Sequence, residues 1–270
     1  MIRLTFSLLQ KLIAGDFIKK LIYLLCAAFF GISAAAAEPI SIAHRGAPDY
    51  APENTISSFL IAEVQGADAV ELDVWLTADQ KLAVNHDDTA GRVWNRELKL
   101  ETASMAELSA LTLSHGFKAA FPQFRAERMP QFCEVISRLS GDMRIFAELK
   151  TQSRAAVDAL VAELVRTGTK DRTTIICFSR EVVAYAATKG VDCAWLVCCE
   201  KPEQVLELDV PAGCALDVNC AALDENTVKA LHERGVIVYC WTAAGQSEFE
   251  KMAGLQVDGI TCDNLSFLKK

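Results

Sequence analysis

Basic side chains are the scarcer charged residues in this sequence, and their scarcity excludes one class of partner. The 270 residues carry 27 Lys and Arg against 35 Asp and Glu, giving a formal net charge of −8 and a pI of about 5.1. Nucleic acids and other polyanions are usually held by a basic surface, which this balance does not provide. A small anionic ligand would instead need a local positive centre, and a bound metal ion can supply one.

The cysteines lack the spacing of a zinc site. The chain has ten of them but no C-x-x-C or C-x-x-x-C pair, so no zinc site is predicted. Cys177, Cys240 and Cys262 lie in apolar, strand-like runs, where a cysteine usually serves as a small buried hydrophobic residue. Cys26 lies in the N-terminal segment, residues 1–37, which we predict below to be a cleaved export signal. Without it nine cysteines remain, which is an unusual number of thiols for an exported protein. The sequence also has no internal repeat and no low-complexity linker.

The N-terminal segment, residues 1–37, differs from the rest of the chain. A pair of lysines precedes an apolar run at residues 21–32, and Ala35-x-Ala37 follows. This order is typical of a secretory signal peptide, so we predict cleavage before Glu38 and a periplasmic or secreted mature protein. The alternative is an uncleaved membrane anchor, because the run reaches about seventeen residues when the alanines are counted, near the lower limit for crossing a bilayer.

Residues 38–270 are expected to form one α/β domain. Short β-rich runs alternate with amphipathic stretches, a pattern that predicts a parallel α/β fold. The length suits a single (β/α)8 TIM barrel, which typically takes about 250 residues. We predict barrel strands at Ile40–Ala43, Ala69–Val74, Arg144–Lys150, Thr174–Phe178, Cys193–Val197, Cys214–Val218, Val236–Trp241 and Gly259–Cys262.

One stretch after the second strand breaks this alternation. Residues 74–77 and 81–85 are both strand-like, and only residues 78–80 separate them. A parallel crossover needs a dozen or more residues, so we predict an antiparallel hairpin. The hairpin would bring His86 to the carboxyl ends of the barrel strands, where active sites of this fold lie. Residues 88–130 are then predicted to be a long, partly helical insertion before the third barrel strand.

Three carboxylates fall on strand faces that should point into the barrel mouth. Because side chains alternate along a strand, Glu71 and Asp73 share one face, and the aliphatic residues interleaved with them at positions 70–74 face the surrounding helices. Glu148 and Lys150 share a face in the same way. Three converging carboxylates repel one another unless a cation lies among them, and hard oxygen ligands suit Mg²⁺ or Ca²⁺. The alternative, that they are solvated surface carboxylates, fits poorly with their place in apolar strands.

A series of short motifs follows this strand order. They are His44-Arg45-Gly46, Pro52-Glu53-Asn54-Thr55, Gly66-Ala67-Asp68 leading into Glu71-Leu72-Asp73-Val74, His86-Asp87-Asp88 with Arg92, Phe146-Ala147-Glu148-Leu149-Lys150, Val238-Tyr239-Cys240-Trp241-Thr242 and Val257-Asp258-Gly259-Ile260. The ordered set resembles the glycerophosphodiester phosphodiesterases over residues 40–265. The resemblance implies metal-dependent hydrolysis of small anionic glycerophosphodiesters to glycerol 3-phosphate and an alcohol, with no nucleic-acid partner.

The same resemblance suggests roles for the polar residues of the mouth. His44 and His86 would be the general acid/base pair, and the sequence does not say which is the acid and which the base. The alternative is a surface or core histidine, which we prefer for the other two, His115 and His232. Arg45 and one lysine, Lys150, would hold the phosphate, Arg by bidentate contact and Lys as a point charge, although a single cation is more often simply solvated.

Two further positions keep two interpretations each. Glu53 is expected either to orient a histidine or a metal ligand, or to stabilise the N-terminus of the helix that follows it. Trp241 is expected either to form a wall for the glycerol end of the substrate or to pack in the core.

Some positions depart from the family pattern, and they bear on substrate contacts rather than on the reaction. Ala243 replaces the Asn that follows the Trp-Thr pair, Cys262 and Leu265 interrupt the late T-D-x-P motif, and Cys177 replaces the Ser of the fourth strand. These changes affect substrate contacts. A lysophospholipase D-like or sphingomyelinase D-like enzyme acting on lipids, or a non-catalytic phosphodiester-binding relative, remains an alternative. Membrane contact is expected only if residues 1–37 stay attached or the substrate is a lipid.

Overall fold

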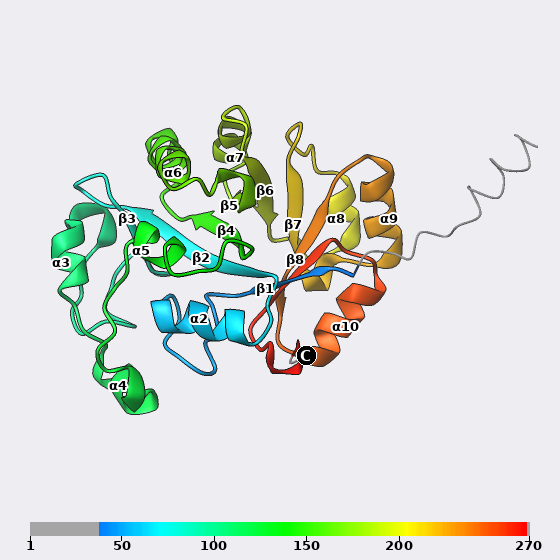
Figure 1. Ribbon diagram of the computed structural model, residues 1–270. Coiled ribbons are helices and arrows are strands. Elements are labelled where there is room, and N and C mark those ends of the chain that lie inside the picture. The colour runs from blue at the N-terminus through cyan, green and yellow to red at the C-terminus, as the bar shows by residue number, and fades with distance from the viewer. Residues whose placement is uncertain (1–37, 269–270) are drawn as a thin grey trace, which may run out of the picture. The chain divides into compact units, whose positions relative to one another are not determined.

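The computed structural model describes residues 38–268, which form a closed barrel of eight parallel strands (Figure 1). The strands are β1 (Ile40–Ala43), β2 (Ala69–Leu76), β4 (Arg144–Leu149), β5 (Thr173–Cys177), β6 (Asp192–Val197), β7 (Ala215–Asn219), β8 (Val238–Ala243) and β9 (Gly259–Cys262). They pair in this order around the barrel, and β9 pairs with β1 to close it. The predicted TIM barrel is confirmed, and the predicted strand ends differ by at most two residues from the observed ones.

Helices follow the strands and cover the outside of the barrel (Figure 1). They are α2 (Ile56–Val64), α6 (Arg154–Thr167), α7 (Arg180–Ala187), α8 (Pro202–Leu206), α9 (Glu225–Glu233) and α10 (Gln246–Gly254), with short 3-10 turns η3 (Lys170–Arg172), η4 (Cys220–Ala222) and η5 (Ser266–Leu268). The largest apolar cluster lies between strands and helices, and it contains Val70, Leu72 and Val74 as the alternation on β2 predicted. A second cluster, which includes Ile42, Phe146 and Tyr239, fills the barrel interior.

The hairpin after β2 is also confirmed. β3 (Leu82–Val84) pairs antiparallel with β2, so that Val74 lies opposite Val84. The turn between them is tight, since the Thr77 amide donates to the Lys81 carbonyl at 2.9 Å. β2 therefore extends past the barrel, and the chain returns directly to the mouth at His86.

The insertion predicted at residues 88–130 is partly helical, as expected. It contains η1 (Leu100–Thr102), α3 (Met105–Ser109), α4 (His115–Ala120) and η2 (Pro122–Phe124), and α5 (Phe132–Ile136) follows it before β4. The insertion has an apolar cluster of its own around Trp94, whose indole N–H donates to Asn85 Oδ1 at 3.0 Å. This contact anchors the insertion to the residue just before His86.

The predicted signal peptide, residues 1–37, lies outside the residues that the structure describes. Between residues 38 and 268, none of the helices has the length and apolarity needed to cross a membrane.

The cysteines of the described chain carry free thiols. All nine are unbridged, and Cys177, Cys240 and Cys262 are fully buried in their strands, as their apolar surroundings predicted. These three cysteines act as small hydrophobic residues in the wall of the barrel.

Candidate active site

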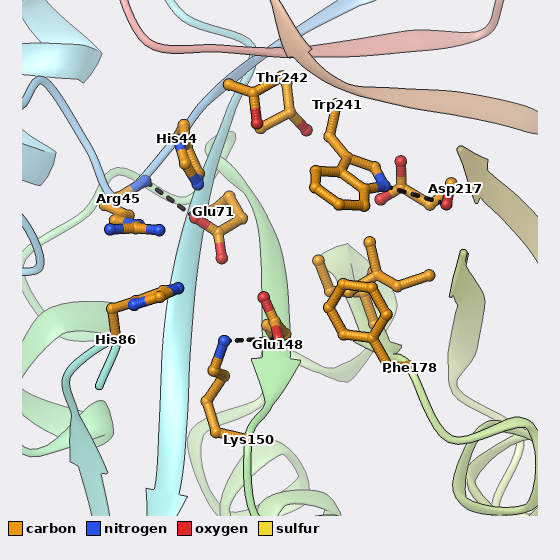
Figure 2. Close-up of a pocket in the computed structure, with 13 residues that line it drawn as sticks. His44, Arg45, Glu71, His86, Glu148, Lys150, Phe178, Asp217, Trp241 and Thr242 are labelled. Carbon is orange, nitrogen blue, oxygen red and sulfur yellow. Dashed lines mark hydrogen bonds and ion pairs between the residues drawn. The ribbon is translucent and has the colours of Figure 1, made fainter. Parts of the chain in front are cut away.

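A cavity of about 280 Å³ opens at the carboxyl ends of the strands. Its lining residues are His44, Arg45, Glu71, His86, Glu148, Lys150, Ile176, Phe178, Leu196, Asp217, Trp241, Thr242 and Thr261. Figure 2 shows that the labelled cationic and imidazole side chains lie on one side, with Glu71 and Glu148 between them and the aromatic side chains of Phe178 and Trp241. We call the side with His44, Arg45, His86 and Lys150 the charged wall, and the side with Phe178, Trp241 and Asp217 the aromatic wall.

Three carboxylates gather at the base of the charged wall. Glu71 and Asp73 lie on β2 and Glu148 on β4, and the strand register places Asp73 directly opposite Glu148. One oxygen from each lies within 4.8 Å of the others. Burial raises the pKa of Glu71 well above its usual value, and repulsion from Asp73 and Glu148 adds to the effect. Such a cluster is stable only beside positive charge.

The three carboxylates are oriented in a way that fits one hard divalent cation. Glu71 Oε2 accepts from the backbone N–H of Arg45 at 2.9 Å, and Asp73 Oδ2 accepts from the Asn54 amide at 2.8 Å. Asp73 Oδ1 is buried, and no described residue donates a hydrogen bond to it. Carboxylate oxygens held by such outer hydrogen bonds are the ligands that Mg²⁺ and Ca²⁺ prefer. The acidic triad could therefore bind one ion.

His44 is positioned by the closure of the barrel. It follows β1, and its Nδ1 lies 2.5 Å from Oδ1 of Asp263, which follows β9. The parallel pairing of β1 with β9 brings these two strand ends together. Because Asp263 engages Nδ1, the other ring nitrogen remains for the cavity that His44 lines. Asp263 occupies the Asp position of the late T-D-x-P motif, but its pairing with His44 was not predicted from the sequence.

His86 is positioned by the returning hairpin and by its own neighbour. Its Nδ1 lies 2.8 Å from Asp87 Oδ1, and Arg92 Nε donates to the other carboxylate oxygen of Asp87 at 2.5 Å. Burial lowers the pKa of His86, although the charge of Asp73 opposes the shift. The imidazole is thus favoured in its neutral form, which can accept a proton.

Glu53 joins two arginines. It accepts from Arg45 at 2.9 Å and from Arg92 at 2.6 and 2.8 Å. Helix α2 begins only at Ile56 and is capped by the Thr55 side chain. Within residues 38–268, the hydrogen bonds and ion pairs of Glu53 go to these two arginines and not to a histidine or a triad carboxylate. Its partner Arg92, which the motif included without a role, is the residue that sequence reasoning missed here.

Arg45 and Lys150 carry the positive charge next to the triad. Lys150 Nζ lies 2.8 Å from Glu148 Oε1 and 3.5 Å from Asp73 Oδ1. Burial alone would lower the pKa of Lys150, but Asp73 and Glu148 raise it, so the ammonium stays charged. Arg45 takes a left-handed φ of 55°, and the next residue must be glycine, since a Cβ on Gly46 would lie 2.7 Å from the backbone of α2.

The aromatic wall comes from the opposite strands. Phe178 follows β5 and meets Trp241 of β8 edge to face, with 5.7 Å between ring centroids. The Trp241 indole N–H donates to the backbone carbonyl of Asp217 on β7 at 3.2 Å. Trp241 thus lines the cavity, which is the position expected if it forms a wall for the substrate.

Asp217 lines the cavity and was not predicted as a site residue from the sequence. Its side chain is only 1% exposed, and neither carboxyl oxygen has a hydrogen-bond partner among residues 38–268. Burial, with the nearby charge of Glu148, raises the pKa of Asp217 to about 8. The available signal was a carboxylate on the inward face of an otherwise apolar predicted strand. The two remaining histidines do not line the cavity: His115 begins α4, and His232, which lies on α9, pairs with Asp258 just before β9.

Known proteins resemble this chain over most of its length. The model of the glycerophosphoryl diester phosphodiesterase family matches residues 44–266. The glycerophosphodiester phosphodiesterases of Caldanaerobacter subterraneus subsp. tengcongensis and Bacillus altitudinis are both 28% identical, over 83% and 82% of this chain and 93% of their own lengths. An Oleispira antarctica phosphodiesterase, solved in complex with the product sn-glycerol-3-phosphate, superposes with a TM-score of 0.75 at 24% identity, covering 86% of this chain and 95% of its own.

Proposed function

Because this chain belongs to the glycerophosphoryl diester phosphodiesterase family, we propose that it hydrolyses glycerophosphodiesters to glycerol 3-phosphate and an alcohol, with one bound divalent cation. The observation that carries the proposal is the convergence of the acidic triad with two histidines that are each held by a carboxylate. The product bound to the Oleispira antarctica relative supports the choice of substrate class.

Glu71, Asp73 and Glu148 would hold the cation, which we propose to be Mg²⁺ or Ca²⁺. When bound, such an ion stabilises the negative charge that develops on phosphoryl oxygens. The side chains of Arg45 and Lys150 line the same cavity and hold the phosphate from the charged wall. Arg45 is kept in place by Glu53, so its guanidinium is already oriented before substrate arrives.

The two histidines move the protons. One accepts a proton from the nucleophile, which is either water or the substrate's own glycerol hydroxyl, and the other protonates the leaving oxygen. If the glycerol hydroxyl attacks, a cyclic phosphate forms, and water must open it in a second step to give glycerol 3-phosphate. Asp263 and Asp87 each lie within hydrogen-bond distance of the Nδ1 of one ring, which fixes the orientation of that ring and leaves its other nitrogen for the substrate. A positioned acid and base in one pocket are the groups that phosphodiester cleavage requires.

Release of glycerol 3-phosphate from a panel of diesters, with and without a chelator, tests the proposal. The expected result is metal-dependent release from at least one soluble glycerophosphodiester, with activity restored by Mg²⁺ or Ca²⁺. If product forms only from lysophospholipids or sphingomyelin, the enzyme acts on lipids instead. If no diester is cleaved under any metal condition, a binding role replaces hydrolysis.

The site of action is a separate proposal that rests on the sequence of residues 1–37. The lysine pair Lys19–Lys20, the apolar run and Ala35-x-Ala37 support export with cleavage before Glu38. Mass spectrometry of the periplasmic or secreted protein should find an N-terminus at or near Glu38. An intact N-terminus on a membrane-bound protein would make this an anchored enzyme.

A further inference from the structure

Asp217 faces the cavity because of its place on β7. Leu216 and Val218 belong to the apolar layer beneath the helices, whereas Ala215 belongs to the cluster inside the barrel. Side chains alternate along a strand, so Asp217 points inward with Ala215. It is one of the residues that line the cavity. Its carboxyl group is therefore directed at whatever occupies the mouth.

A buried carboxyl group without partners is costly, and it indicates a ligand. Buried polar groups nearly always have a hydrogen-bond partner, and leaving one unpaired destabilises the fold. Among residues 38–268, both oxygens of Asp217 lack such a partner. Asp217 is also separate from the acidic triad that could hold a metal ion. No protein group and no expected ion accounts for it.

The surroundings of Asp217 describe the group that would fit there. Leu196 lies opposite Asp217 on the neighbouring strand, Ile176 lines the same cavity, and the Trp241 indole N–H donates to the Asp217 backbone carbonyl. The charged wall on the other side is suited to a phosphate. The part of the ligand that reaches Asp217 must therefore carry hydrogen-bonding groups on a small carbon skeleton that packs against aliphatic and aromatic side chains.

We infer that Asp217 is a specificity-determining residue that binds the free hydroxyl groups of the substrate's glycerol, while Trp241 and Phe178 contact its carbon atoms. This inference rests on the proposed function. A carboxylate accepts hydrogen bonds from two hydroxyls, and a carboxylic acid donates one bond and accepts another, so Asp217 can pair with glycerol in either state. An acyl chain on a hydroxyl removes a donor and adds bulk in a cavity of about 280 Å³. The site thus favours deacylated diesters over lysolipids.

A cationic head group is the competing occupant of this wall. Aromatic rings beside a carboxylate can bind an ammonium group. That arrangement needs a negative charge on the acid, whereas burial raises the pKa of Asp217 to about 8 and favours the neutral acid at pH 7. Hydroxyl groups pair with the neutral acid and an ammonium group gains little from it, so the observations favour glycerol.

Paired substrates test this inference. Glycerophosphocholine is compared with the analogue in which propane-1,2-diol replaces glycerol, so that only the terminal hydroxyl is missing. The wild-type enzyme should prefer the glycerol ester by about 10- to 100-fold in kcat/KM, since losing one hydrogen bond leaves a buried group unpaired. Asp217→Leu should reduce this preference to near unity by raising KM for the glycerol ester. Asp217→Asn should keep part of it, because the amide both donates and accepts.

The controls separate the possible failures. Asp192→Asn changes an exposed aspartate at the opposite end of the neighbouring strand β6 and should leave both constants unchanged. If the wild-type enzyme lacks the tenfold preference, the inference is overturned without any variant. A folded Asp217→Leu protein that keeps the preference also overturns it. If Asp217→Leu loses activity on the choline and ethanolamine esters but still cleaves glycerophosphoglycerol, Asp217 binds an ammonium group instead. If wild type cleaves no diester, the proposed function itself has failed.

Discussion

The two walls of the cavity differ in how the protein holds their charged side chains. On the charged wall, ion pairs run from Arg45 through Glu53 to Arg92 and on to Asp87 and His86. On the aromatic wall, the carboxyl group of Asp217 has no such partner within residues 38–268. On the charged wall and at its base, Arg45 Nε and Asp73 Oδ1 also lack a hydrogen-bond partner within residues 38–268, but both side chains are held by other contacts, whereas no described contact holds the carboxyl group of Asp217.

This difference suggests that the charged wall carries out the reaction and the aromatic wall selects the substrate. Groups that bind a transition state act best when they are oriented in advance, which is what the chain of ion pairs provides. Groups that select a substrate act by the contacts that a wrong substrate fails to make. We therefore expect changes on the charged wall to affect turnover, and changes on the aromatic wall to affect substrate preference and stability.

Loss of a triad carboxylate, or of the metal ion, should have the largest effect on activity. Glu71→Ala, like dialysis against a chelator, should reduce activity to background, because the phosphate loses its main source of positive charge. Adding Mg²⁺ or Ca²⁺ should restore the dialysed wild type but not the variant. Calorimetric titration of metal measures the loss of binding, with Asp192→Asn as the control. Full turnover in a sample verified to be metal-free would refute the mechanism.

Removing one histidine should have the next largest effect. His44→Ala or His86→Ala should lower kcat by about 10²–10⁴, the usual contribution of general acid–base catalysis. Metal affinity should stay nearly intact, because neither ring belongs to the triad. Steady-state kinetics and metal titration of the same samples test both statements. Near-normal turnover of either variant would remove that histidine from the acid–base pair.

On the aromatic wall, Asp217→Asn should change how the stability of the protein depends on pH. The pKa of Asp217 is about 8 in the folded protein, against 3.8 for an ordinary aspartate. The unfolded chain loses this proton near pH 4 while the folded chain keeps it, so wild-type stability falls as pH rises from about 4 to 8. The asparagine variant lacks this loss and should be more stable than wild type above pH 8, by on the order of 5 kcal/mol.

Urea unfolding at pH 5 and pH 8.5 measures this effect. The triad titrates in both proteins, so its contribution cancels in the difference between them. A difference in unfolding free energy that is the same at both pH values would mean that Asp217 is ionised in the folded state.

Glu53→Gln should produce the smallest effect. The amide keeps the size of the side chain but loses the charge that holds Arg45 and Arg92. Because Glu53 acts through Arg45, we expect KM for the diester to rise about tenfold with a smaller change in kcat. Metal affinity and melting temperature serve as controls, since a merely structural role would change the latter. A fall in kcat alone would place Glu53 closer to the reacting atoms.

The sequence predicts the barrel and the inward faces of its strands because both depend on local patterns. Alternation on β2 places Glu71 and Asp73 in the mouth, and the three-residue turn leaves the antiparallel return to His86 as the only route. What it does not reveal are partners that meet only in the closed barrel. Asp263 reaches His44 from 219 residues away, and its pairing depends on strand register rather than on motif spacing.

Asp217 escaped prediction for another reason. Its strand was predicted almost to the residue, but a single aspartate in an apolar run does not show from sequence whether neighbouring strands offer it a partner. Glu53 is similar, because its second arginine lies 39 residues further along the chain, beyond the hairpin. In both cases the missing information is the identity of side chains that meet across different strands and loops.

The pairing of β1 with β9 has a consequence for the newly made chain. These are the first and last strands of the barrel, and His44 receives its aspartate only when they meet. Contacts between distant parts of a chain form late in folding. During synthesis the segment with His44, the triad and His86 emerges long before Asp263. We therefore expect a nascent chain to lack hydrolytic activity until its final strand has been made and has closed the barrel.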